Sequence, residues 1–359
     1  MTVEDLPFCR EVTGLPKPAA YGFANTFRGM TGRWPLPILN YTSAPMSEAV
    51  DRAMNAREFD MIHLDSMHMI RYALAAVKRQ SSLKVIYNWH NIESEAMRRY
   101  SAASPGRARR WYAAHTAKKM EAIEKTMLGS AFGHLVCSQR EYDQLRRIAP
   151  AARIAVIENG VDTAYFAPTG EGTGARRQIV FVGVMDYFPN SDAAIFFANR
   201  IWPQVRSRLS DAELLIVGAN PGLAVRALAE LPGVKVTGTV PDVRTYYSGA
   251  FAAIVPLRTG GGTRLKILEA MAAGVPVVST PLGAEGLEVA NNENALLVDS
   301  DDVQGWMERL VSLAESAARR EQLSEAGLRL VKTRYDWEIL GAKLRETYQR
   351  WLEESASER

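Results

Sequence analysis

The sequence predicts an α/β protein built from two doubly wound halves in series. Short apolar runs rich in β-branched residues alternate with segments of helical length, which is the pattern of βαβ units and a parallel sheet. The chain has 359 residues, and one hydrophobic core rarely serves that many, so two domains are expected. A glycine-rich stretch at 169–177 (TGEGTGARR) interrupts the alternation, which then restarts. We therefore expect one sheet on each side of this segment.

The first half begins with residues 1–45, which are rich in Pro, Gly and aromatic residues and show little periodicity. Regular alternation follows, and its β-branched runs predict strands at 61–65, 83–90, 134–138 and 153–160. Helical periodicity is found at 46–57, 67–79, about 107–127 and 139–147.

The second half repeats this pattern and ends in three helices. Strands are expected at 178–183, 212–218, 234–238, 251–257 and 275–280. Helices are expected at about 191–207, near 222–230, near 242–248, after Thr263, and at 302–316, 319–333 and 337–354.

Composition excludes several classes of protein. Apolar residues make up 47% of the chain and charged residues 23%, and the net charge of +3 is too small to indicate nucleic-acid binding by itself. The two cysteines, Cys9 and Cys137, form neither a disulfide framework nor a CxxC metal pair, which is typical of a reducing cytosol. The N-terminus lacks a signal pattern, and no apolar run approaches membrane-spanning length. We expect a cytoplasmic protein, soluble or peripheral at the membrane.

The stretch Thr259–Gly274 (TGGGTRLKILEAMAAG) carries the most chemistry. Three glycines precede a helix, so unhindered amides and the helix dipole favour an anion there. Arg264 and Lys266 add positive charge beside the same helix start, and Glu269 lies further along, where it could accept hydroxyl hydrogen bonds. A diphosphate with an attached sugar or ribose would satisfy these groups together. A glycine-rich turn with surface cations is the alternative.

This stretch has neither the Gly-Lys-Ser/Thr of a P-loop nor the G-x-G-x-x-G of a dinucleotide site. It resembles the retaining glycosyltransferases of family 4, which have the GT-B fold, and within them a bacterial subgroup with FVGxMDYxPN. The resemblance rests on FVGVMDYFPNSDA (181–193), ELLIVGANP (213–221), VTGTVPDV (236–243), the GGGTRLKILEAMAAGVPVVST block, ENGVD (158–162) and HNIESE (90–95).

The resemblance implies two Rossmann-like domains that face a central cleft. The expected parts are an acceptor-side domain at 1–165, a nucleotide-sugar domain at 166–335, and a last helix at 336–359 that crosses back to the first domain. Members of the family usually begin with a strand, a glycine-rich loop and a helix that find no match ahead of 61–65. The first domain is therefore expected to lack its first strands, and a misplaced start, a natural truncation or a degenerate partner protein would each explain this.

The resemblance also assigns roles to residues. Glu269 matches a glutamate that contacts the nucleotide ribose, whereas Gly261 stands where the family carries a glutamate to the donor sugar. Val184 and Pro189 replace a usual Arg and Lys, so Arg264 and Lys266 are expected to hold the diphosphate and stabilise it as its bond to the sugar breaks. The other donor contacts expected from the motifs are Gly183, Gly260, Gly262, Thr263 and Leu265.

Other candidates leave alternatives open. His90 matches a histidine near the transferring sugar, or it is a cap or core residue. Asn159 either touches the donor or forms a hinge turn, and Asn-Gly favours the turn. Asp186 and Asn190 either contact a substrate or cap the next helix. Val240 follows a strand where the family reads the base through backbone atoms.

Two further patterns need an interpretation. The stretch from Arg98 to Lys119 is basic and aromatic, so it is either a membrane-facing patch or a solvated helix face. Asp299 and Asp301 look like a metal-binding Asp-x-Asp but lie in a polar turn that opens a helix, where capping is expected. No metal site and no cofactor are expected, because the nucleotide-diphosphate sugar is a substrate.

The resemblance implies transfer of a sugar from a nucleotide-diphosphate sugar to a glycan or lipid-linked acceptor with retention of configuration. Polysaccharide or cell-envelope glycan synthesis is the expected setting, with no nucleic-acid partner. Two alternatives stay open: an inactive nucleotide-sugar-binding partner subunit, and a nucleotide-sugar epimerase on the same fold.

Overall fold

The computed structural model describes residues 9–16, 22–103, 106–168, 177–260 and 264–357. The chain divides into two compact units. Unit 1 contains Met1–Ile157 and Trp351–Arg359, and unit 2 contains Glu158–Arg350. Most of the glycine-rich segment at 169–177, together with Gly261, Gly262 and Thr263, lies outside the described residues.

Unit 1 is built on a parallel four-stranded sheet whose strands lie in sequential order. The strands are β1 (Met61–Leu64), β2 (Lys84–Trp89), β3 (Gly133–Val136) and β4 (Ile154–Val156). All four expected strands are found, although β4 is shorter than the run 153–160. Among the described residues no strand precedes β1. The order of the described strands of unit 1 does not reverse, so of the two described sheets only that of unit 2 has a switch point.

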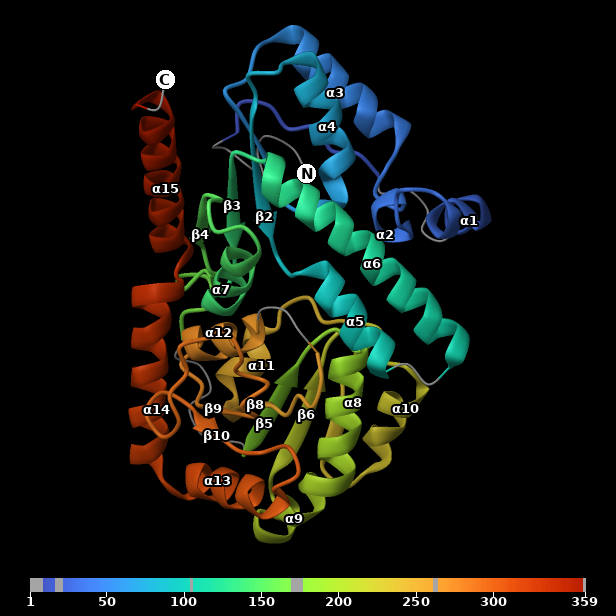
Figure 1. Ribbon diagram of the computed structural model, residues 1–359. Coiled ribbons are helices and arrows are strands. Elements are labelled where there is room, and N and C mark those ends of the chain that lie inside the picture. Colours follow the sequence, from blue (N-terminus) through green and yellow to red (C-terminus); the bar gives the residue numbers. More distant parts are fainter. Residues whose placement is uncertain (1–8, 17–21, 104–105, 169–176, 261–263, 358–359) are drawn as a thin grey trace. The chain divides into compact units, whose positions relative to one another are not determined.

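The helices of unit 1 include four that were expected and three that were not. The expected ones are α3 (Ala44–Ala56), η1 with α4 (Met67–Met69, Ile70–Arg79), α6 (Arg107–Ser130) and α7 (Gln139–Ile148). The unexpected ones are α1 (Phe23–Thr31), α2 (Leu36–Leu39) and α5 (Glu93–Ala103). Because right-handed crossovers between sequential parallel strands turn to the same side, α4, α6 and α7 cover one face of the sheet (Figure 1).

The core of unit 1 follows from two periodicities. Val85, Tyr87 and Trp89 alternate along β2 and point to one face of the sheet, while Met120 and Met127 lie two turns apart on α6. All five side chains are buried in a single apolar cluster. Burial of this helix stripe against the strand face holds α6 on the sheet.

Unit 2 has a parallel six-stranded sheet of order β10-β9-β8-β5-β6-β7. The strands are β5 (Gln178–Val182), β6 (Glu213–Val217), β7 (Val234–Val236), β8 (Ala250–Val255), β9 (Val277–Ser279) and β10 (Leu296–Leu297). Five of the six were expected, and the two-residue β10 was not. The order runs one way from β5 and the other way from β8, so this sheet is doubly wound and its switch point lies between β5 and β8.

Helices cover both faces of this sheet (Figure 1). The expected helix at 191–207 is three pieces, in which a π-helical turn joins two α-helices. Pro203 explains the break, because it lacks the amide hydrogen that an α-helix needs. The helical elements of unit 2 are α8 (Phe188–Phe196), η2 (Phe197–Ile201), α9 (Trp202–Arg208), α10 (Leu223–Arg226), η3 (Ala227–Glu230), α11 (Arg244–Ser248), α12 (Leu265–Ala272), α13 (Val303–Glu315), α14 (Ala317–Leu330) and η4 (Val331–Tyr335).

The last helix, α15 (Trp337–Ser357), begins in unit 2 and ends in unit 1. Its buried Trp351 packs against the start of β3. Gly133 leaves no room there for a Cβ atom, because the indole ring occupies that space. The C-terminal residues of α15 are therefore part of the structure of unit 1.

The loops that follow β5 and β6 approach each other more closely than any side chain would allow. Gly218 has φ +147°, and a Cβ atom on it would overlap the carbonyl oxygen of Gly183. The amide of Gly183 also donates to Val217 O at 3.0 Å, and Met185 N donates to Ala219 O at 2.8 Å. Glycine at 218 is required by both the conformation and the space.

We predict that Gly218→Ala lowers the free energy of unfolding by at least about 3 kcal/mol, because strain and overlap add together. Gly222→Ala is the matched control, since Gly222 has φ −67°, which L-residues adopt readily, and no atom lies within 4 Å of its Cβ position. We expect the control to change stability by less than about 0.5 kcal/mol. Urea unfolding followed by tryptophan fluorescence measures both, and equal stabilities of the two variants would contradict the packing described.

Candidate functional site

A cavity of about 570 Å³ opens at the switch point of the sheet in unit 2. The ends of β5, β6, β7 and β8 and the start of α12 form its walls, as expected for a ligand site in a doubly wound sheet. Of the expected donor residues, it brings together Gly183, Val240, Arg264, Leu265, Lys266 and Glu269.

Lys266 is held in this cavity by two neighbouring side chains. Its Nζ donates to Asn190 Oδ1 at 2.6 Å and lies 5.0 Å from the centre of the Phe181 ring. Burial, and then the nearby Arg264, lower the pKa of Lys266 to about 8. The ammonium group is therefore costly to keep charged in this place, and an anion beside it would stabilise the charged form.

Arg264 is more deeply buried than a surface cation would be, with 4% of the residue exposed. Its Nη2 donates to Gly260 O and to Leu282 O, both at 3.3 Å. Gly260 has φ +114°, a conformation that favours glycine. Part of the guanidinium fork thus holds the backbone at Gly260 and Leu282, while Arg264 also adds charge to the cavity.

Glu269 lies in the same wall and is held by a residue that sequence reasoning missed. The hydroxyl of the buried Tyr247 donates to Glu269 Oε2 at 3.3 Å, and Tyr247 comes from α11. Burial raises the pKa of Glu269 above its usual value. No sequence pattern marks Tyr247, because it is one of two adjacent tyrosines in a short helix.

Asn190 does not cap a helix, so the capping alternative is wrong, and Asn190 lines the cavity instead. The residue at the start of α8 is Tyr187, which makes no side-chain cap, and Asn190 lies inside the helix. Its Nδ2 donates to Val184 O at 2.9 Å while its Oδ1 accepts from Lys266. A Cβ atom at Gly183 would press on this side chain. Asn190 therefore positions Lys266.

Asp186 does not cap α8 either, and it is not among the residues that line the cavity. Its Oδ2 accepts a hydrogen bond from Asn220 Nδ2 at 3.0 Å, which ties the loop after β5 to the loop after β6. Val240 does line the cavity. Near it, Asp242 is held by the guanidinium of Arg244, with Nη2 2.6 Å from Oδ2.

Asn159 was expected to form a turn with the following glycine, and this expectation is wrong. No turn forms at Asn159 and Gly160, and φ of Gly160 is not positive. Instead Val161 forms a parallel bridge with Asp336. Gly160 is needed because a Cβ atom there would press on Tyr335 O. Asn159 is not among the residues that line the cavity.

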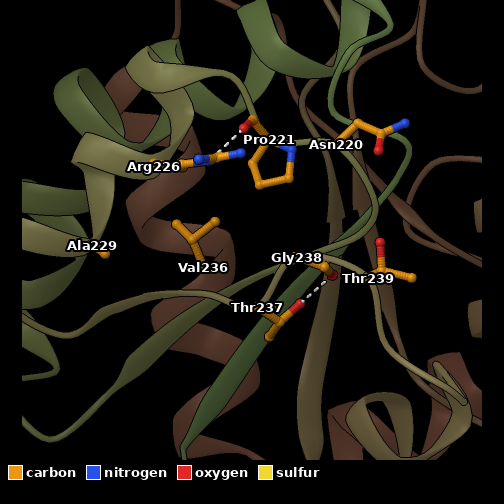
Figure 2. A pocket seen from close by; sticks show the side chains of 8 residues that line it. All are labelled: Asn220, Pro221, Arg226, Ala229, Val236, Thr237, Gly238 and Thr239. Carbon is orange, nitrogen blue, oxygen red and sulfur yellow. Dashed lines mark hydrogen bonds between the residues drawn. The ribbon is translucent and has the colours of Figure 1, made fainter.

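A second cavity, of about 430 Å³, adjoins the first at Thr239, which lines both. Figure 2 shows Asn220, Pro221 and Arg226 on one side of it and the segment 236–239 on the other. Arg226 Nε donates to Pro221 O at 2.7 Å, so the one basic side chain in Figure 2 is held by backbone.

His90 lies in unit 1, immediately after β2. Its Nε2 is 2.8 Å from Asp65 O and 3.2 Å from Asp65 Oδ1, and Asn88 Nδ2 donates to the same Oδ1 at 2.8 Å. The hydrogen bond with Asp65, followed by the interaction with Cys137, raises the pKa of His90 to about 10. At neutral pH His90 is therefore a cation held by a carboxylate at the end of the neighbouring strand.

The Asp-x-Asp pattern is a helix start, but the capping residue differs from the expected ones. Asp302, rather than Asp299 or Asp301, precedes α13 and accepts from Gly305 N at 2.8 Å. Within the described ranges, no group of three or more His, Cys, Asp or Glu side chains is arranged to hold a metal ion.

Fold and cavity together define a class of protein: two parallel-sheet α/β domains, one of which offers two cations, Arg264 buried and Lys266 half-buried, at its switch point. The N-terminal part matches the Glycosyltransferase Family 4 model over residues 8–165, and the C-terminal part matches the Glycosyl transferases group 1 model over residues 176–316. Each part of the chain is thus similar to a glycosyltransferase family model.

Individual relatives agree with these matches. A D-inositol 3-phosphate glycosyltransferase of Thermobispora bispora is 29% identical over 230 residues, 57% of this chain and 52% of that protein. A phosphatidyl-myo-inositol mannosyltransferase of Mycolicibacterium smegmatis is 32% identical over 202 residues, 54% of this chain and 51% of that protein. The chain thus spans about half the length of the curated relatives it matches.

Solved structures identify the fold. Sucrose-phosphate synthase from Thermosynechococcus elongatus superposes with a TM-score of 0.68 and 21% identity, covering 86% of this chain and 77% of that one. The fold is thus the GT-B fold of glycosyltransferases.

We predict that Asp65→Asn lowers the pKa of His90 from about 10 toward the ordinary value of about 6.5, because the carboxylate that favours the charged ring is gone. Titration of the ring protons of His90 by NMR measures this shift. Asp60→Asn, at the exposed opposite end of β1, is the matched control and should leave the titration unchanged. A His90 ring that stays charged at pH 9 in Asp65→Asn would contradict the assignment.

Proposed function

We propose that the chain is a glycosyltransferase that moves a sugar from a nucleotide-diphosphate sugar to a glycan or lipid-linked acceptor. The observation that carries this proposal is the cavity at the switch point of unit 2, where Arg264 and Lys266 lie beside Glu269. A buried cation and a half-buried one next to one carboxylate suit a diphosphate that is joined to a hydroxyl-bearing ring.

The same charges have a role in the reaction. As the bond between the sugar and the diphosphate breaks, negative charge grows on the leaving phosphate oxygens. Lys266, held by Asn190 at 2.6 Å, is placed in advance and needs little reorganisation to stabilise that charge. Arg264 adds a second fixed positive charge from the start of the same helix. The catalytic contribution of unit 2 is thus electrostatic.

Glu269 would accept hydrogen bonds from the ribose, and Val240 lies where backbone atoms would meet the base. Gly183, Gly260 and Leu265 would complete the contacts to the donor. We assign His90 to the sugar or the acceptor as a fixed cation, because its raised pKa makes it a poor base at neutral pH. In this proposal Asp186 and Asn159 make no direct contact with the donor.

We infer retention of configuration, with the acceptor hydroxyl attacking from the side of the leaving phosphate, and a reaction that needs no metal ion. The names of both relatives describe inositol-containing acceptors, one of them a lipid, which supports the lipid-linked arm of the proposal. We propose synthesis of polysaccharide or cell-envelope glycans on the cytoplasmic side of the membrane.

We predict that affinity for UDP or GDP falls as the pH rises from 7 to 9. The pKa of Lys266 is about 8, so below pH 8 the ammonium is charged, and above it binding requires uptake of a proton. Above pH 8 the affinity for UDP or GDP should therefore fall by roughly tenfold for each pH unit. Calorimetric titration over this range measures it.

Lys266→Arg is the matched variant for this pH test, because a guanidinium stays charged at every pH used. Its affinity should be nearly independent of pH. An equally steep fall in Lys266→Arg would assign the titration to another group.

We predict that Glu269→Ala weakens binding of UDP or GDP roughly 10- to 100-fold, which corresponds to loss of hydrogen bonds to a charged group. Glu325→Ala, an exposed carboxylate on α14, is the control and should bind normally. An unchanged affinity of Glu269→Ala, with an unchanged unfolding temperature, would remove Glu269 from the donor site.

A panel of UDP- and GDP-sugars, assayed for hydrolysis and for transfer with and without EDTA, tests the function as a whole. Turnover that survives EDTA and yields a product of retained anomeric configuration is expected. Binding without turnover of any donor would indicate the inactive partner subunit, and interconversion of free nucleotide sugars would indicate an epimerase.

A further inference from the structure

Positive charge is concentrated in two stretches of unit 1. Residues 12–47 and residues 96–120 contain no aspartate or glutamate, although the whole chain is nearly neutral at +3. The second stretch contains Arg107, Arg110 and Lys118, all of which are exposed. The excess is therefore local and belongs to the first half of α6 and to the segment that contains α1.

The structure brings these two stretches together. Lys119 Nζ donates to three carbonyl oxygens at the end of α1, those of Gly29, Met30 and Gly32, at 2.7 to 2.8 Å. His115 Nε2 lies 3.0 Å from Met30 O. These contacts satisfy the free carbonyls at the helix end and hold α1 beside α6.

Large apolar side chains are exposed on the same two helices. Phe27 is 61% exposed and Met30 is 38% exposed, and the two are three residues apart on α1. Trp111 is 59% exposed, and its ring stacks on His115 with centroids 5.5 Å apart. The contact between His115 and Met30 links this tryptophan to the end of α1.

Helix geometry places the cations of α6 next to the tryptophan. Arg107, Arg110, Trp111 and Lys118 follow one another at helical spacing, so they share one face of α6. The basic face ends at Glu121, which pairs with Arg98 and with Lys125. The patch is thus bounded, basic and aromatic, and differs from the ion-paired surface beside it.

We propose that this α1–α6 surface (Phe27, Met30, Arg107, Arg110, Trp111 and Lys118) docks on an anionic membrane. Cations attract acidic head groups, while an exposed tryptophan and two apolar side chains enter the boundary between head groups and acyl chains. No helix within the described ranges is both long and apolar enough to span a bilayer. Phe27 and Met30 favour a membrane over nucleic acid, since acyl chains accept both and phosphates attract neither.

The test is flotation of the full chain with vesicles of phosphatidylcholine alone or mixed equally with phosphatidylglycerol. The chain should bind only the mixed vesicles, and added salt should weaken binding. The triple variant Arg107→Gln, Arg110→Gln, Lys118→Gln should lose roughly 100-fold of the partition coefficient, about a factor of five for each cation. Some vesicle binding of the wild type should persist at high salt, because apolar contacts are not screened. The double variant Phe27→Ser, Trp111→Ser should lack this salt-resistant part of the binding.

The matched control removes three exposed cations from unit 2, by Arg200→Gln, Arg208→Gln and Lys332→Gln, and should bind like the wild type. Equal loss in the control would reduce the effect to net charge and overturn the proposal. The proposal would also be overturned if the wild type did not bind the mixed vesicles. It would be overturned too if RNA displaced the bound chain through the same residues. Glu269→Ala should bind vesicles normally, so this proposal and the donor site fail independently.

Discussion

The site in unit 2 is organised around two neighbouring cations, of which Arg264 is buried and Lys266 half-buried. Lys266 and Arg264 flank the start of α12, and burial together with mutual repulsion lowers the pKa of Lys266 to about 8. Asn190 and the ring of Phe181 hold the ammonium group, and Glu269 offsets part of its charge. Keeping two positive charges close together and partly out of water costs free energy, and a bound anion would offset that cost. A diphosphate between the two cations would be such an anion. The proposed donor chemistry follows from that electrostatic constraint.

The backbone makes this arrangement possible. At the switch point of the sheet, Gly218 lies so close to Gly183 that no side chain fits between them. The loops after β5 and β6 are therefore pressed together, and Asn190 reaches from α8 both to Val184 and to Lys266. A glycine pair, an amide and a lysine thus form one connected group that holds the ammonium group in place.

Much of this could be predicted from the sequence, because strand and helix periodicity is a local property. The strands β1, β2, β5, β6 and β8 and the grouping of Arg264, Lys266 and Glu269 were found from pattern alone. The misses depend on contacts between distant residues. Asn159 and Gly160 look like a turn, but they lead into Val161, which forms a bridge with Asp336. Asn190 looks like a cap but holds Lys266, and no sequence pattern marks Tyr247. The helices α1 and α2 were missed because tertiary contacts such as those of Lys119, rather than periodicity, hold the N-terminal segment.

The most direct measurement is a crystal structure of the chain soaked with UDP or GDP. The account predicts diphosphate oxygens within hydrogen-bond distance of Lys266 Nζ and beside the Arg264 guanidinium, with a ribose hydroxyl bonded to Glu269. A nucleotide bound elsewhere on the chain, or bound here with its diphosphate turned away from Lys266 and Arg264, would contradict it.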